Sequence, residues 1–182
     1  MLEELKEANS YISSKIDKYR SRSLLIKEIE EDAEINNVPI ISKEIREYLK
    51  FIIKSNKNIK NILEIGTATA YSGIIMAEEI QDRNGCLTTI EIDEIRYKKA
   101  VENFKKMGLF EKNNLIMGDA LEEIPKLDKN IKYDFIFIDA AKGQYSKFFQ
   151  MCYEMLCENG IIFIDNIAFR GFVKFQKDIR LL

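Results

Sequence analysis

Residues 61–72 read NILEIGTATAYS, an apolar run that gives way to Gly66 and a polar loop before a helical pattern begins near residue 71. Four more apolar runs follow along the chain: CLTTIEI (86–92), NLIMG (114–118), YDFIFID (133–139) and GIIFID (160–165). Amphipathic helical stretches lie between them, near 71–81, 94–107 and 144–157. Strands that alternate with helices predict βαβ units, and therefore an α/β fold whose parallel sheet is buried on both faces.

The region before residue 61 shows the spacing of helices. Apolar side chains recur at helical intervals in two groups, Leu2, Leu5, Ile12 and Ile16, then Leu24, Leu25, Ile29 and Ala33. The second helix should end near Pro39, because a residue before proline disfavours the α conformation. Ser42 suits the N-cap of a third helix over 43–55, with a buried stripe of Ile45, Leu49, Ile52 and Ile53. We expect a single domain over 1–182, with helices in 1–55 and a sheet in 61–182.

The composition narrows the possible chemistry. The 182 residues are 46% hydrophobic and 32% charged, as in a globular protein with a core, and they include no histidine. A Ser-His-Asp triad, a Cys-His dyad and a His-ligated zinc site are therefore excluded within this chain. The cysteines, Cys86, Cys152 and Cys157, form no Cys-x-x-Cys pair and suit a reducing compartment. We see no apolar signal core and no membrane-spanning run, so we expect a cytoplasmic protein without a membrane partner.

Charge is almost balanced over the whole chain. The formal net charge is −2 and the pI is about 5.5, which argues against broad nucleic-acid binding. Two segments are basic, however, because 15–22 and 167–182 each carry four cationic residues and one aspartate. Solvated helix faces are one explanation. The other is a small phosphate-binding surface made by Arg20, Arg22, Arg170 and Lys174.

Polar residues follow each apolar run, at the carboxyl ends of the predicted strands, where open α/β sheets bind ligands. The first loop has Ala68 where a dinucleotide fingerprint needs its second glycine, and it lacks a P-loop lysine. Glu64 would also repel phosphate. A positively charged nucleoside ligand fits better, and S-adenosylmethionine is one. Glu91, at the end of the second run, stands where an acid can bind ribose hydroxyls.

Asp139, Asp165 and Asn166 follow two predicted neighbouring strands. These residues could simply cap the segments that come after them. The competing hypothesis is a site for Mg²⁺ or a similar hard cation, built from two carboxylates, an amide oxygen and waters. Lys142 is either an ordinary solvated lysine or, beside such a cation, a base with a lowered pKa.

Taken together, LEIGTATAYS, IEID, GDA, FIDAAKGQY and DN resemble the motifs of the cation-dependent O-methyltransferases, the family of catechol and caffeoyl-CoA O-methyltransferases. Within this family, FIDAAKGQYSKFF and DNIAFRGFV are most similar to the bacterial tRNA 5-hydroxyuridine methyltransferases. The resemblance implies a Rossmann-like class I methyltransferase fold that uses S-adenosylmethionine and Mg²⁺. It implies that Asp139, Asp165 and Asn166 bind the metal, and that Lys142 and Asp139 are catalytic. The implied cofactor-binding residues are Ile41, Glu64, Gly66, Thr67, Ser72, Glu91, Asp119, Ala120 and Asp139.

The resemblance also implies a reaction, the methylation of the 5-hydroxyl of 5-hydroxyuridine in a tRNA anticodon loop. A small catechol-like phenol is the alternative acceptor, and an inactive nucleoside-binding module is a third hypothesis. Ala70 stands where the family commonly has glycine, which predicts strain if this position needs a positive φ. The family normally adds a C-terminal hairpin that we do not find in the sequence, so we expect one side of the sheet to expose an edge and apolar surface. Either the sequence is truncated, which would explain the inactive module, or a partner subunit covers this edge, and we expect a homodimer.

Overall fold

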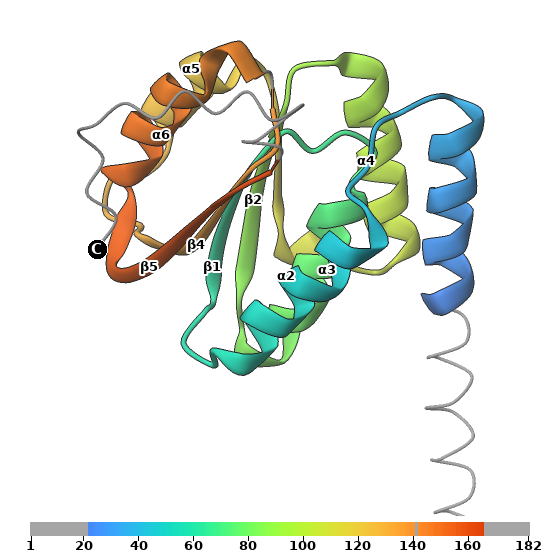
Figure 1. Ribbon diagram of the computed structural model, residues 1–182, viewed down its shortest axis with the longest axis horizontal. Coiled ribbons are helices and arrows are strands. Elements are labelled where there is room, and N and C mark those ends of the chain that lie inside the picture. The colour runs from blue at the N-terminus through green and yellow to red at the C-terminus, as the bar shows by residue number, and fades with distance from the viewer. Residues whose placement is uncertain (1–21, 141, 166–182) are drawn as a thin grey trace, which may run out of the picture.

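Five strands form one parallel sheet in the computed structural model, which describes residues 22–140 and 142–165 (Figure 1). They are β1 (Asn61–Ile65), β2 (Cys86–Glu91), β3 (Asn114–Met117), β4 (Tyr133–Ile138) and β5 (Leu156–Ile164). The order across the sheet is β3-β2-β1-β4-β5, so the chain runs outward from β1 to β3 and then returns to the other side of β1. This confirms the predicted α/β fold. Such sheets bind ligands where the strand order reverses, here between β1 and β4.

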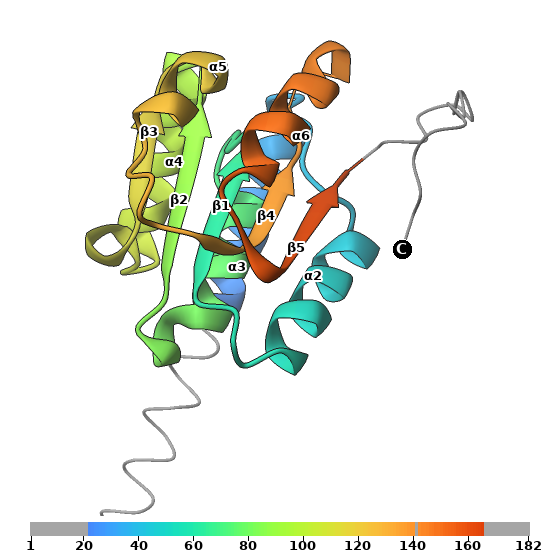
Figure 2. The ribbon, with the colours of Figure 1, turned by 90° about the vertical axis from the view of Figure 1, so that its left-hand side faces the viewer.

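Helices cover both faces of the sheet (Figures 1 and 2). On one face lie α2 (Lys43–Ser55), α3 (Tyr71–Ile80) and α4 (Glu94–Lys106), with a helix over residues 22–35 packed on the same side. The other face carries α5 (Ala120–Glu123) and α6 (Tyr145–Tyr153). Short 3-10 turns lie at Gln81–Arg83, Phe110–Lys112, Ile124–Lys126 and Lys142–Gln144. The predicted cap of α2 is confirmed, because Ser42 Oγ accepts a hydrogen bond from the backbone N of Ile45 at 3.3 Å.

Each strand sends alternate side chains into two separate cores. Phe135 and Phe137 of β4 belong to the core under α2, α3 and α4, whereas Ile136 and Ile138 belong to the core under α5 and α6. All four side chains are fully buried. Burial of one such side chain contributes roughly 1.5–3 kcal/mol. The strands are therefore rich in apolar residues, because both of their faces are covered.

The boundary between α6 and β5 differs from the prediction. The helix expected to reach residue 157 ends at Tyr153, and the strand expected from residue 160 begins at Leu156. Between its pairings with Tyr133 and Phe135, β5 advances from residue 156 to residue 161, so residues 157–160 bulge out of the ladder. Two exposed polar residues in this bulge interrupt the apolar run and hide the start of the strand.

The helix over 22–35 buries Ile29 and Ala33 as predicted, but Leu24 is 60% exposed. Leu24 and Leu25 are adjacent, so they cannot both face the core, and it is Leu25 that packs against it. Other predictions fall outside the described residues: the helix over 2–16, Arg20, Asn166, Arg170 and Lys174. In the part of the chain that is described, none of the helices combines the length and the apolar character needed to cross a bilayer.

Candidate active site

A cavity of about 520 Å³ lies at the carboxyl ends of the strands. Its walls come from the segment before α2 and from the loops that follow all five strands. It brings together most of the residues predicted for a cofactor site, namely Ile41, Gly66, Thr67, Ser72, Glu91, Asp119, Ala120 and Asp139. Asp165, predicted as a metal ligand, lines the same cavity. The volume falls in the range of small-molecule sites.

The loop between β1 and α3 has an unusual backbone. Gly66, Ala68 and Ala70 have φ angles of 95°, 47° and 73°. Gly66 also has no room for a side chain, because a Cβ there would lie 2.2 Å from the backbone oxygen of Asp139. The positive φ considered for Ala70 is confirmed, and an alanine in this region costs about 1–2 kcal/mol. The loop is therefore strained, and contacts from other elements must offset the strain.

Side chains from β2 and α4 hold this loop in place. Glu91 Oε2 accepts a hydrogen bond from the backbone N of Ala68 at 2.7 Å, and its Oε1 accepts one from Asp93 N at 2.9 Å. The buried Asn103 donates from Nδ2 to the backbone oxygen of Thr69 at 2.9 Å. Each carboxylate oxygen keeps a second lone pair, so Glu91 can still accept from a ligand hydroxyl. Glu91 thus holds the loops that follow β1 and β2, in addition to its predicted contact with ribose.

Glu64 lies elsewhere than the sequence suggested. Its side chain is fully buried and is not among the residues that line the cavity. The hydroxyls of Ser72 and Thr89 donate to its two carboxylate oxygens at 2.5 and 2.6 Å, and Gly73 leaves room for it. Burial raises the pKa of Glu64 to about 8, despite these two hydrogen bonds. The carboxyl is therefore mostly protonated at neutral pH, so it would not repel a phosphate group. Its hydrogen bond with the Ser72 hydroxyl holds Ser72 in place beside the cavity.

Asp139 and Asp165 follow neighbouring strands, and the backbone N of Asp165 donates to the oxygen of Ile138 at 3.0 Å. The Tyr145 hydroxyl donates to the backbone oxygen of Asp165 at 3.1 Å, and burial together with these two carboxylates raises the pKa of Tyr145. The described residues include no cluster of three or more His, Cys, Asp or Glu that could hold a metal. The predicted third ligand, Asn166, lies outside them. Two carboxylates at neighbouring strand ends are nevertheless donors that suit a hard cation.

Several cavity residues were not predicted, among them Pro39, Arg96, Gln144 and Phe148. The sequence did contain a signal for Arg96, because Asp93, three residues earlier, suits the N-cap of a helix. In the structure Asp93 Oδ1 accepts a hydrogen bond from the backbone N of Arg96 at 2.9 Å, and α4 begins there, beside the cavity. Nothing in the sequence marked Phe148 as a cavity residue, since an aromatic residue at helical spacing usually belongs to the hydrophobic core. The backbone of Lys142 begins the 3-10 turn Lys142–Gln144, but its side chain lies outside the described part of the structure.

The cavity is acidic. Among the described residues that line it, the charged ones are Glu91, Asp119, Asp139, Asp165 and Arg96. Asp119 Oδ1 also caps α5 by accepting from the backbone N of Leu121 at 2.9 Å. An excess of negative charge in a cleft favours a ligand that carries positive charge.

Arg22 is the one predicted phosphate contact that falls within the described residues. Its Nε lies 3.3 Å from Glu78 Oε1, and its Nη2 donates to Gln81 Oε1 at 3.4 Å. The side chain is 27% exposed. Arg22 is therefore already engaged within the protein, and its contacts do not support a role in phosphate binding.

Comparison with known proteins gives a consistent result. A family model for O-methyltransferases matches residues 15–180. The caffeoyl-CoA O-methyltransferase of Stellaria longipes is 33% identical over 129 residues, which cover 69% of this chain and 53% of that protein. The catechol O-methyltransferase of Niastella koreensis is 35% identical over 114 residues, which cover 62% of this chain and 51% of that protein. The chain thus spans about half the length of these two relatives. The crystal structure of an O-methyltransferase from Bacillus cereus in complex with SAH matches with a TM-score of 0.75 at 26% identity, covering 81% of this chain and 68% of that one.

Proposed function

This chain belongs to the O-methyltransferase family, and we propose that it transfers a methyl group from S-adenosylmethionine to an acidic hydroxyl of an acceptor. The observation that carries the proposal is the acidic cavity at the carboxyl ends of the strands, where Glu91 anchors the loop that begins at Gly66. The cavity, the loop and the family membership all favour S-adenosylmethionine as the ligand.

The cofactor fits the charge and the polar groups of the cavity. S-adenosylmethionine carries a sulfonium and an ammonium group, which suit an acidic lining. The remaining lone pairs of Glu91 would accept hydrogen bonds from the ribose hydroxyls. Ser72, supported by Glu64, offers a further polar contact beside the first loop. The relative from Bacillus cereus was solved with SAH, the product form of this cofactor, which supports the assignment.

We propose that Asp139, Asp165 and Asn166 would hold Mg²⁺ next to the cofactor. A divalent cation bound there would supply positive charge that lowers the pKa of the acceptor hydroxyl and orients it. Tyr145 would keep the loop after β5 in place through its hydrogen bond to the backbone of Asp165. Lys142, three residues after Asp139, would accept the proton of the acceptor or stabilise its oxyanion. The enclosure of both reactants in one cavity would supply much of the acceleration.

The acceptor that we favour is a small phenol with two adjacent oxygens, because the relatives of this chain include catechol and caffeoyl-CoA O-methyltransferases. The motifs FIDAAKGQYSKFF and DNIAFRGFV support a second candidate, 5-hydroxyuridine in a tRNA anticodon loop. Its 5-hydroxyl and 4-carbonyl are adjacent oxygens like those of a catechol. A base in a single-stranded loop can also be reached without opening a duplex.

The test is incubation with labelled S-adenosylmethionine and Mg²⁺, with either a panel of catechols or undermodified tRNA as acceptor. Glu91→Gln should weaken SAH binding by roughly 1.5–3 kcal/mol in calorimetry, as expected when hydrogen bonds to a charged group are lost. Glu94→Gln, at an exposed position nearby, is the matched control and should bind normally. Cofactor binding without transfer to either acceptor would refute the enzyme and leave a nucleoside-binding module.

A further inference from the structure

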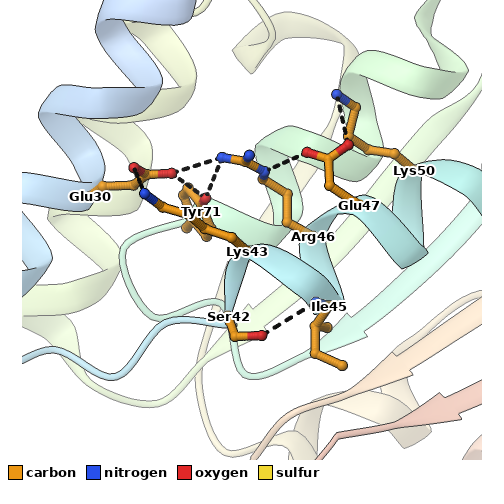
Figure 3. A network of polar contacts seen from close by, with 8 residues as sticks. All are labelled: Glu30, Ser42, Lys43, Ile45, Arg46, Glu47, Lys50 and Tyr71. Atoms are coloured by element: carbon orange, nitrogen blue, oxygen red, sulfur yellow. Dashed lines mark hydrogen bonds and ion pairs between the residues drawn. The ribbon is translucent and has the colours of Figure 1, made fainter.

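Three side chains join the helices that flank the candidate active site (Figure 3). The Tyr71 hydroxyl donates to Glu30 Oε1 at 2.5 Å, and Arg46 Nη1 donates to Glu30 Oε1 at 2.9 Å and to the Tyr71 hydroxyl oxygen at 3.1 Å. Glu30 lies in the helix over 22–35, Arg46 lies in α2, and Tyr71 is the first residue of α3. We call these three residues the clasp.

The clasp is a largely buried polar cluster. The side chains of Glu30 and Arg46 are 20% and 23% exposed, and Tyr71 is 2% exposed. Water screens such a cluster less than it screens an ion pair on the surface, so the contacts are stronger. Burial and the hydrogen bond to Glu30 raise the pKa of Tyr71 to about 12, so the hydroxyl keeps the proton that it donates.

The segment 39–41 connects the two helices that carry Glu30 and Arg46, and all three of its residues line the cavity. It makes no hydrogen bond to any other described residue. The nearest backbone hydrogen bonds lie on either side of it, from Val38 N to Ala33 O at 2.8 Å and from Arg46 N to Ser42 O at 2.9 Å. Ile41 anchors the segment in the core under α2, α3 and α4, and the backbone of the segment is otherwise positioned by how the two neighbouring helices are docked to each other.

The clasp also reaches the opposite wall of the cavity. Tyr71 directly follows the strained loop 66–70, and it lines the cavity while its hydroxyl is held by Glu30 and Arg46. We propose that the clasp is a positioning device that couples segment 39–41 to loop 66–70 and so sets the affinity for the cofactor. Glu30 and Arg46 do not line the cavity, so they act through the residues that do. The inference rests on the proposed function, because it takes the ligand to be S-adenosylmethionine.

Tyr71→Phe tests the clasp, because it removes the hydroxyl and keeps the buried ring. We expect about fivefold weaker SAH binding in calorimetry, the low end of coupling between sites. The KM for S-adenosylmethionine should rise while kcat at saturation stays nearly constant. Glu30→Gln should act in the same direction, and the double variant should lose less than the two single effects added together, since both changes break one cluster. Glu47→Gln changes only exposed contacts, with Arg46 Nε at 2.9 Å and with Lys50 Nζ at 3.9 Å, and is the matched control.

Amide hydrogen exchange in the cofactor-free protein tests the coupling without any binding step. In Tyr71→Phe, exchange should accelerate at Val38 on one side and at Ile74 on the other, where Ile74 N donates to Ala70 O at 2.9 Å. Acceleration at Ile74 alone, or an unchanged affinity for SAH, would overturn the proposal. Ile80→Val, a buried change at the far end of α3, controls for general loss of stability.

An equal loss of affinity in Ile80→Val would also overturn the clasp, because the effect would then be global. If the wild-type protein fails to bind SAH, the proposed function falls. The exchange rates at Val38 and Ile74 would still decide whether the clasp joins the two walls.

Discussion

Replacing Glu64 with glutamine should stabilise the protein, and the gain should grow as the pH rises. Glu64 is fully buried, and its burial raises the pKa from 4.5 to about 8. The folded protein must therefore hold a proton on this carboxyl at neutral pH. Glutamine has nearly the same size and carries no charge at any pH, and its amide oxygen can accept a hydrogen bond from one of the two hydroxyls that donate to Glu64.

The sign of the effect follows from proton linkage. Between pH 4.5 and pH 8 the folded state holds a proton on Glu64 that the unfolded state has lost, so a rise in pH lowers the free energy of unfolding. One pH unit in this window costs about 1.4 kcal/mol. From pH 5.5 to pH 7.5 the contribution of Glu64 should fall by roughly 2.5 kcal/mol, and the loss should level off above the folded pKa.

Urea unfolding of wild type and Glu64→Gln at pH 5.5, 6.5 and 7.5 measures this difference. The advantage of the glutamine variant should widen by about 2.5 kcal/mol across the series. Glu94→Gln is the control, because Glu94 is exposed and its hydrogen bond with Lys98 lowers its pKa, so this variant should not reproduce the gain. Parallel curves for Glu64→Gln and wild type would refute the argument that a buried, protonated Glu64 limits stability.

Other perturbations test the loop, a helix end and the metal. Ala70→Gly should raise the free energy of unfolding by about 1 kcal/mol, because φ at this position is 73°; no gain in urea unfolding would contradict strain there. Arg83→Met should destabilise the protein by roughly 1.5–3 kcal/mol. Its Nη1 donates to the backbone oxygens of Ile53, Asn56 and Ile59 at 2.9 to 3.1 Å, and an unchanged melting temperature would show that these contacts contribute little. A chelator should abolish methyl transfer and added Mg²⁺ should restore it, whereas full activity of Asp165→Ala in excess chelator would rule out the proposed metal site.

The elements that follow from local pattern were predictable from the sequence. The run 61–65 coincides with β1, because a strand covered on both faces is mainly apolar and is bounded by polar turns, although Glu64 interrupts this run. The helix over 43–55 was equally clear, since Ser42 caps it and Leu49 and Ile53 fall on its buried face. The carboxyl ends of parallel strands meet at one edge of the sheet, so the position of the cavity also followed from the sequence.

The features that the sequence did not predict depend on contacts between residues far apart in the chain. Glu64 stands next to the first loop in sequence, but strand alternation turns its side chain into the core, where Thr89 meets it. The charge of Arg22 suggested a contact with phosphate, but Arg22 forms an ion pair with Glu78 of α3. The start of β5 was missed because a bulge over 157–160 breaks the pattern. Sequence pattern reports periodicity along one element, and none of these three features is periodic.

The strained loop 66–70 shows how the candidate site depends on the fold around it. Glu91 holds the loop from β2, Asn103 holds it from α4, and Tyr71 ties its end to the clasp. A loop that is already held in its binding conformation loses less conformational entropy when a ligand binds, so each anchor should contribute to affinity through the loop. Glu91 should behave differently from the other two anchors, because it would both hold the loop and contact the cofactor. Loss of Asn103 or of the Tyr71 hydroxyl should therefore weaken cofactor binding less than loss of Glu91, even where it lowers the stability of the protein as much.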